Sequence, residues 1–204
     1  MDFMEPLVLF RNRWLLVFLF GITACRNGKT ENWTSADALP VPTYYKPGND
    51  TELNKRQDTL YIGNSLYNGY IYQLYEKGDT QFIFGYVNGL EEGIFKKWYP
   101  NRQIQEVRFY HRGKKNGTCT NWWDNGNKKF EFSTIDDLYE GKFSEWNREG
   151  KLIKDFNYRH GQEQGSEKLW WNDGTIRANY VVDNGRKYGL IGLKLCRNVY
   201  DSLK

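Results

Sequence analysis

The chain of 204 residues has few of the residue types on which catalytic and metal sites depend. It contains only 2 histidines, 2 methionines and 3 cysteines. His111 and His160 lie far apart in the sequence, and each stands shortly before a glycine, in a context typical of a solvated turn, so a shared metal or acid–base role is not expected. The sequence also has no phosphate-binding loop, zinc-ligand spacing or nucleophile elbow. We therefore expect no enzymatic activity, no catalytic residues, no metal, no cofactor and no small-molecule substrate.

The chain also lacks a strong excess of one charge. Its 29 basic and 25 acidic residues leave a net charge of +4, and the two signs are interspersed. Proteins that bind nucleic acid usually have a clustered basic face, so a nucleic-acid partner is not expected. Aliphatic residues are few, whereas aromatic residues make up 17% of the chain and glycine occurs 20 times. This composition favours short strands and tight turns over helices.

Long apolar runs are absent except for one near the N-terminus. Arg11 and Arg13 precede the uninterrupted apolar stretch Trp14–Ile22, which is followed by small residues. A spanning helix needs about 18 to 20 apolar residues, so this stretch is too short for one. A positive flank, a short apolar segment and small residues are the parts of a secretory signal peptide.

The residues Ile22-Thr-Ala-Cys25 resemble the lipobox of bacterial lipoproteins. The resemblance implies cleavage before Cys25 and acylation of its sulfur and of the new amino terminus, which supplies the several chains that stable membrane attachment needs. An anchor left in place or an ordinary signal peptide are the alternatives. We expect a lipoprotein signal peptide over residues 1–24, a flexible tether over 25–58, and a protein lipid-anchored in a bacterial cell envelope, facing away from the cytoplasm.

Glycine recurs at a fixed interval through the rest of the chain. Six glycines stand 24 residues apart with no insertion or deletion, which identifies an array of one small repeated unit. We expect these glycines to mark turns that define the repeat. They are Gly69, Gly93, Gly117, Gly141, Gly165 and Gly189.

Each repeat has the pattern of a β-hairpin. A tryptophan stands five residues after the leading glycine in four units, and a turn glycine and an aromatic cluster follow it. Glycine can take the positive φ that a hairpin turn requires, so each unit is predicted to be two strands, and successive hairpins one antiparallel meander. The predicted fold is all-β and elongated. The repeat array covers residues 59–195 and contains five full units at 69–188. An incomplete unit that begins at Thr59 caps one end of the array, another that ends at Leu195 caps the other end, and residues 196–204 form a tail.

The recurring tryptophans can be interpreted in two ways. They can stack as the thin core of the sheet, or they can form an exposed ladder that binds glycan rings or lipid headgroups. A hairpin array has little else to bury, and an aromatic side chain buries about 150 to 250 Å², so we favour a core role. The four positions are Trp98, Trp122, Trp146 and Trp170.

The remaining reactive residues are predicted to be structural. Cys119 is expected to be a packed thiol in a first strand, and it is too far from Cys196, about three repeats away, for a disulfide. Glu91-Glu92 and Asp136-Asp137 are expected to be solvated charge pairs in turns. Only Cys25, outside the repeat, is expected to undergo covalent chemistry.

The repeat resembles the variant MORN repeat of bacterial proteins. The resemblance rests on Trp122-Trp-Asp-Asn-Gly126 and Trp170-Trp-Asn-Asp-Gly174, each with an aromatic strand after it, and it covers residues 59–195. Bacterial proteins of this kind are often grouped as YwqK-type antitoxins, so the resemblance implies a protein that works by binding another protein. A lipoprotein would meet a toxin-like partner outside the cytoplasm. The leading hypothesis is a membrane-tethered protein-binding scaffold, and the alternative is an envelope module that binds glycan or phospholipid through its aromatic positions.

Overall fold

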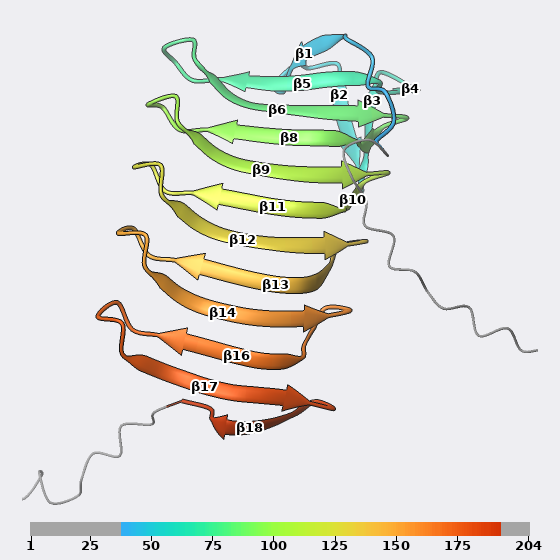
Figure 1. Ribbon diagram of the computed structural model, residues 1–204. Helices are drawn as coiled ribbons and strands as arrows, with labels where there is room; N and C mark the ends of the chain where they lie inside the picture. Colours follow the sequence, from blue (N-terminus) through green and yellow to red (C-terminus); the bar gives the residue numbers. More distant parts are fainter. Residues whose placement is uncertain (1–37, 193–204) are drawn as a thin grey trace, which may run out of the picture. The chain divides into compact units, whose positions relative to one another are not determined.

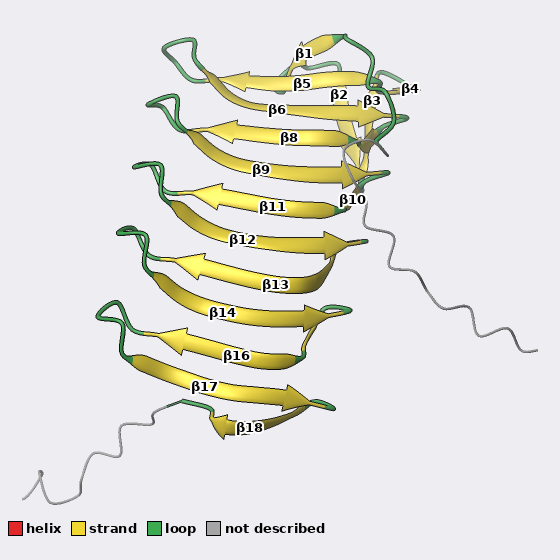
Figure 2. Cartoon of the chain, in the orientation of Figure 1, coloured by secondary structure: helices red, strands yellow, loops and turns green. Residues whose placement is uncertain are grey.

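The computed structural model describes residues 38–192, and every regular element in that range is a β-strand (Figure 1, Figure 2). The predicted all-β fold is therefore confirmed. Three strands form a small sheet: β2 (Leu53–Arg56), β3 (Thr59–Ile62) and β4 (Ser65–Leu66). The other fifteen form the main sheet: β1 (Tyr45–Pro47), β5 (Gly69–Leu74), β6 (Thr80–Val87), β7 (Leu90–Glu91), β8 (Gly93–Trp98), β9 (Ile104–His111), β10 (Lys114–Lys115), β11 (Gly117–Trp122), β12 (Lys128–Ile135), β13 (Leu138–Trp146), β14 (Leu152–Arg159), β15 (Gln162–Glu163), β16 (Gly165–Trp170), β17 (Ile176–Asp183) and β18 (Arg186–Leu190).

The main sheet is a meander in which strands that follow one another in the sequence lie side by side. Its order is β1-β5-β6-β8-β9-β11-β12-β13-β14-β16-β17-β18, and the short strands β7, β10 and β15 pair with β6, β9 and β14. From β5 onward every pair is antiparallel, as predicted, and only β1 pairs in parallel, with β5 (Figure 1). Each unit therefore contacts mainly the units on either side of it.

Two kinds of turn alternate along the meander. The turn inside each hairpin spans five residues and has one residue with a positive φ near its end: a glycine in four units and Arg102, with φ 67°, in the second. The turn between hairpins has two consecutive residues with positive φ, as in the type I′ turns that suit the twist of paired strands. Those pairs are Asn88-Gly89, Arg112-Gly113, Asp136-Asp137, His160-Gly161 and Asn184-Gly185.

The six repeat glycines do not lie in turns, which corrects the prediction. Four of them begin the strands β5, β8, β11 and β16, and the other two lie inside β13 and β18. All six have a positive φ, between 75° at Gly141 and 144° at Gly69. At Gly69 an added Cβ would lie 2.4 Å from the carbonyl oxygen of Tyr44. The 24-residue period thus marks a position at the start of a strand or inside one where the backbone has a positive φ, so that a side chain would be strained or would clash.

The register separates the residues of the main sheet into two faces. Successive residues of a strand point to opposite faces of the sheet. The pairing register places aromatic rings of successive strands on the same face, here called the aromatic face. The opposite face is called the polar face; from β11 onward it carries hydroxyl, amide and charged side chains, including Thr120, Ser133, Ser144, Asp155 and Lys168. The aromatic face carries Phe84, Tyr86, Phe95, Tyr110, Phe130, Phe132, Tyr139, Phe143, Phe156, Tyr158 and Tyr180.

The buried core lies on the aromatic face in two clusters. Near the N-terminal end, Leu60 and Tyr67 pack with Tyr86, so the small sheet covers the first strands of the main sheet. Two backbone hydrogen bonds of Gly89 also hold the small sheet to the main sheet. The N–H of Leu60 donates to the carbonyl oxygen of Gly89, and the N–H of Gly89 donates to the carbonyl oxygen of Tyr67. At the other end the core consists of Phe156, Ala178, Tyr180 and Val182.

Side chains also connect each hairpin to the next. In the first three units, the side chain of the first turn residue, directly after the six-residue first strand, bonds to the following unit, 23 residues along the chain. Such a bond couples neighbouring turns at a fixed spacing. The hydroxyl of Tyr75 donates to the carbonyl oxygen of Trp98 at 2.7 Å, the hydroxyl of Tyr99 to that of Trp122 at 2.9 Å, and the indole N–H of Trp123 to that of Trp146 at 3.1 Å.

The predicted tether and N-terminal half-unit need correction where the structure describes them. Residues 45–47 and 53–56, expected to be flexible, are strands β1 and β2, because their backbone groups pair with β5 and β3. Thr59–Ile62, expected to be half of a unit in the meander, instead belongs to the small sheet. At the other end the meander closes with β18, which ends at Leu190.

Several predictions concern residues outside the described range. The signal peptide, Cys25, the first part of the tether, Cys196 and the C-terminal tail all fall there. Among residues 38–192 there is no helix that is long and apolar enough to cross a membrane.

Candidate functional site

The four recurring tryptophans lie at the ends of the first strands and are only partly buried. Each stands where the pairing register shifts by one residue, beside the hairpin turn. Cations rather than aromatic rings lie over two indoles of this region: Lys128 is 5.7 Å from the ring centre of Trp146, and Lys129 is 4.4 Å from that of Trp123. The tryptophans therefore border the sheet at its turns, and the fully buried clusters consist of other residues.

The ring contacts of the sheet are instead made by Phe and Tyr on the aromatic face. At the middle of this face Phe132 and Phe143 stack with ring centres 5.4 Å apart and an interplanar angle of 3°. Phe130 extends the stack on one side, and Tyr139 packs edge-on against Phe132 at 4.9 Å. Stacked and edge-on pairs each add about 0.5 to 1.5 kcal/mol beyond their area burial, so these rings hold one another in place.

The ring series continues across the next strands without a break. Tyr139 packs against Tyr158 at 5.1 Å, and Phe156 contacts both Tyr158 and Tyr180 at 6.5 and 6.1 Å. We call the series the aromatic patch and define it as Phe130, Phe132, Tyr139, Phe143, Phe156, Tyr158 and Tyr180. Tyr139 is 37% exposed, whereas burial raises the pKa of Tyr158 to about 12.

Charged groups of both signs lie on the same face as the patch. The ammonium of Lys154 is 4.5 Å from the ring centre of Phe143 and 4.3 Å from that of Phe156. Lys187 pairs with Glu163 at 2.7 Å and lies over the ring of Tyr180. The patch therefore combines aromatic area with fixed charges of opposite sign, an arrangement suited to contacts with another protein surface.

A buried carboxylate lies under the C-terminal end of the patch. Glu167 points to the aromatic face opposite Tyr180 and is 0% exposed. Its two oxygens accept the backbone N–H of Asn157 at 3.2 and 3.1 Å. Burial, with the nearby charge of Glu163, raises its pKa to about 7 although the Asn157 N–H opposes the shift.

A second buried carboxylate, Glu92, corrects the prediction that Glu91-Glu92 is a solvated turn pair. The side chain of Glu92 is 1% exposed. One oxygen accepts the N–H of Leu39 at 3.0 Å and lies 3.0 Å from Nδ1 of His111, and the other accepts the N–H of Arg112 at 2.9 Å. His111 is thus a half-buried strand residue and not a solvated one, in contrast to the exposed turn residue His160.

Glu92 belongs to a column of acceptors that the sequence analysis missed. The residue before each repeat glycine is Asn, Glu or Gln in five units, and this recurrence was the available signal. In four units its side-chain oxygen accepts a turn N–H 20 residues later, which satisfies a backbone donor of the two-residue turn. The pairs are Asn68 with Asn88, Glu92 with Arg112, Asn116 with Asp136 and Glu140 with His160.

The remaining candidates lie apart from one another. Cys119 is buried on the aromatic face beside Glu106, and burial raises the pKa of its thiol to about 11, which fits a packed thiol and opposes nucleophilic reactivity. Asp136 and Asp137 form a turn, as predicted. Among the described residues, no group of three or more His, Cys, Asp or Glu side chains is arranged to hold a metal ion.

Comparison with known proteins adds no assignment. No protein-family profile matches the sequence, and no curated protein is significantly similar to it.

Proposed function

We propose that this protein is a non-enzymatic, membrane-tethered scaffold that binds another protein through the accessible rings of the aromatic patch. These are Phe130, Phe132, Tyr139, Phe143 and Tyr158, and the buried Phe156 and Tyr180 support them from within the core. The observation that carries the proposal is the unbroken series of Phe and Tyr rings from β12 to β17 on one face of a single sheet. The small sheet packs on residues of β5 and β6, and its buried cluster includes none of the rings of the aromatic patch. Rigid aromatic side chains are the usual centres of protein–protein interfaces.

The charges around the patch favour a protein partner over an anionic membrane surface. Lys154 faces Glu145 across a strand pair, and Lys187 pairs with Glu163, so the two signs balance. An anionic bilayer would favour an excess of cations. A protein partner can match such alternating charges at the rim of an apolar contact.

The proposed location of the scaffold is supported by the resemblance of Ile22-Thr-Ala-Cys25 to a lipobox. With Cys25 acylated, the repeats would be held at a membrane of the bacterial envelope, facing away from the cytoplasm. The resemblance to variant MORN repeats supports an antitoxin-like or immunity-like role toward a toxin-like protein in that compartment. The partner would then be an exported or secreted effector.

The test is cross-linking and pull-down of the full-length protein from native membranes. Phe132→Ser removes the central ring, and Ser133→Ala changes the neighbouring residue on the polar face as a matched control. A central aromatic contact contributes about 2 kcal/mol or more to binding, so Phe132→Ser is expected to lower partner recovery by about thirtyfold, with no change in Ser133→Ala. Cys25→Ser should move protein and partner together out of the membrane fraction.

Loss of binding must be separated from loss of folding. Tyr139→Ala removes a more exposed ring of the same patch. The loss of its ring contacts should lower the melting temperature by a few degrees, but far-UV circular dichroism should show a folded protein at the assay temperature while partner recovery falls. If both patch variants recover the same partner as wild type, the aromatic patch is not the binding surface.

A specific observation also supports the alternative of an envelope-binding module. Trp171 is 47% exposed at a hairpin turn, and the guanidinium of Arg177 lies 4.7 Å from its ring centre. An exposed indole beside a cation suits a glycan ring or a lipid headgroup. A tryptophan fluorescence response to wall fragments or liposomes that Trp171→Ala or Trp146→Ala removes, without unfolding, would favour this function over the scaffold.

A further inference from the structure

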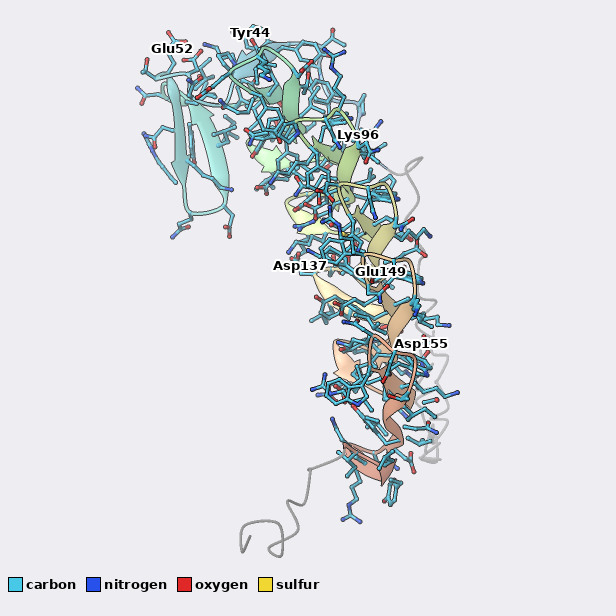
Figure 3. The ribbon with its side chains drawn as sticks, turned by 90° about the vertical axis from the view of Figure 1, so that its left-hand side faces the viewer. Tyr44, Glu52, Lys96, Asp137, Glu149 and Asp155 are labelled. Carbon is cyan, nitrogen blue, oxygen red and sulfur yellow. The ribbon has the colours of Figure 1, made fainter. Side chains whose placement is uncertain are left out.

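A pocket of about 480 Å³ lies on the polar face, opposite the aromatic patch side of the sheet. Its floor is formed by apolar residues on three neighbouring strands: Ile83 on β6, Ile94 on β8 and Phe109 on β9. Figure 3 shows Lys96, which also lines the pocket, on the side of the main sheet away from Glu52 and the small sheet. The volume lies in the range of about 300 to 1,000 Å³ that is typical of small-molecule sites.

One wall of the pocket is the segment Ala38–Val41, which is held to the sheet by specific contacts. The N–H of Leu39 donates to the buried carboxylate of Glu92 at 3.0 Å. Val41 lies against Gly85. A Cβ added at Gly85 would lie 3.0 Å from Cγ2 of Val41 and 2.6 Å from the carbonyl oxygen of Glu92. The absence of a side chain at Gly85 thus makes room for the wall, so the pocket has a built boundary.

The other walls combine aromatic area with one cation. Tyr45 and Tyr70 both line the pocket and stack on each other with ring centres 5.1 Å apart. Lys96 is exposed and has no ion-pair partner among residues 38–192. An apolar floor beside an ammonium that no described carboxylate neutralises is complementary to a ligand with an apolar body and one negative charge.

We propose that this pocket binds a small amphipathic monoanion, with its apolar body on Ile83, Ile94 and Phe109 and its anionic group at the ammonium of Lys96. The proposal does not depend on the scaffold function, because the two surfaces lie on opposite faces of the sheet. The bound ligand would also contact Leu39 and Pro40, so binding would hold the segment Ala38–Val41 against the sheet.

The test uses anilinonaphthalene sulfonate, a fluorescent probe with an aromatic body and one anionic group. Lys96→Gln removes the charge, and the control Lys168→Gln makes the same change at the equivalent position of the last unit, on the same face but outside the pocket. Lys96→Gln is expected to weaken probe binding about fivefold to tenfold, and Lys168→Gln to leave it unchanged.

Two further variants separate the pocket from other apolar surfaces. Ile94→Trp fills the floor and should abolish binding of the probe, whereas Ser166→Trp, at the equivalent position outside the pocket, should not. N-phenyl-naphthylamine, an uncharged probe, should respond to Ile94→Trp and not to Lys96→Gln. All variants are checked for wild-type circular dichroism. Equal effects of the two lysine variants, or loss of probe binding in Phe132→Ser, would overturn the assignment.

Competition identifies the body of the ligand. Displacement of the probe by laurate would indicate an acyl chain, and displacement by naphthoate an aromatic acid; either result supports the proposal. If neither carboxylate displaces the probe, the pocket does not bind amphipathic monoanions.

Discussion

The two fully buried carboxylates, Glu92 and Glu167, differ in the number of donors that surround them. Glu92 meets two backbone N–H groups and the ring of His111, whereas Glu167 meets the single N–H of Asn157. A buried charge that is not compensated by hydrogen bonds favours the protonated form. The pKa of Glu167 is accordingly raised from its ordinary 4.5 to about 7. Between pH 4.5 and about 7, folding is therefore accompanied by uptake of a proton at this carboxyl.

The raised pKa of Glu167 predicts that the protein loses stability as the pH increases. A carboxyl whose pKa is higher in the folded than in the unfolded state contributes fully to stability below the unfolded-state pKa of about 4.5. That contribution is lost as the pH rises through the folded-state pKa of about 7. Glu167→Gln keeps an acceptor for Asn157 but has no charge to bury. It is expected to raise the free energy of unfolding by about 2 kcal/mol at pH 8 and to flatten its dependence over this range. Urea unfolding from pH 4.5 to 8 measures this.

The control for that prediction is Glu149→Gln, an exposed turn residue labelled in Figure 3. Its pH profile should match that of the wild type. An unchanged slope in Glu167→Gln would mean that the buried carboxyl is not the source of the pH dependence.

At the scale of one element, the five hairpin turns use the same backbone geometry with different residues. Gly78, Gly126, Gly150 and Gly174 supply the positive φ near the end of four turns, and Arg102 supplies it in the second. A non-glycine residue in this region costs about 1 kcal/mol or more. The ion pair of the exposed Arg102 with Asp79 offsets little of that cost, because solvent screens the guanidinium.

Arg102→Gly is therefore expected to stabilise the protein by about 0.5 to 1 kcal/mol and to raise its melting temperature by a few degrees. The reciprocal change, Gly126→Arg, should destabilise it by a similar amount, because it places a side chain in the same conformation of the next unit. Differential scanning calorimetry compares the two. A decrease in melting temperature for Arg102→Gly would show that the ion pair with Asp79 outweighs the backbone strain.

At the scale of the whole molecule, the strand order makes the array modular from β5 onward. Each hairpin pairs with the hairpins that precede and follow it, and the side-chain bonds between units span 20 or 23 residues. Stability of such an array approximates a sum over units and their neighbouring contacts. An internal unit can then be removed if its two neighbours can pair with each other.

Deletion of residues 117–140, one complete unit of 24 residues, is expected to leave a folded protein with fewer strands. The deletion joins Asn116 to Gly141, so the acceptor still precedes a repeat glycine. Far-UV circular dichroism should retain its β signal, with a melting temperature lower by several degrees. Deletion of 117–128, which removes one strand and reverses the direction of every later one, should unfold or aggregate. Equal loss of structure in both would argue against independent units.

The sequence by itself determined the repeat, the hairpin in each unit and the antiparallel order of the meander. Those features depend on local properties: the positive φ available to residues such as Gly78 and Gly126, and alternation along short strands. The same local information also placed Asp136-Asp137 in a turn and Cys119 in a strand.

Only the tertiary structure decided which side chains are buried and which surfaces are formed. Glu92 and His111 meet across 19 residues, and Leu39 reaches Glu92 across 53, so no local pattern could show that this carboxylate is buried or that the expected tether forms a pocket wall. Each first-strand tryptophan likewise lies at a register shift beside a turn, and other residues form the buried clusters. Burial and site geometry depend on which strands become neighbours, and that is settled only when the units pack.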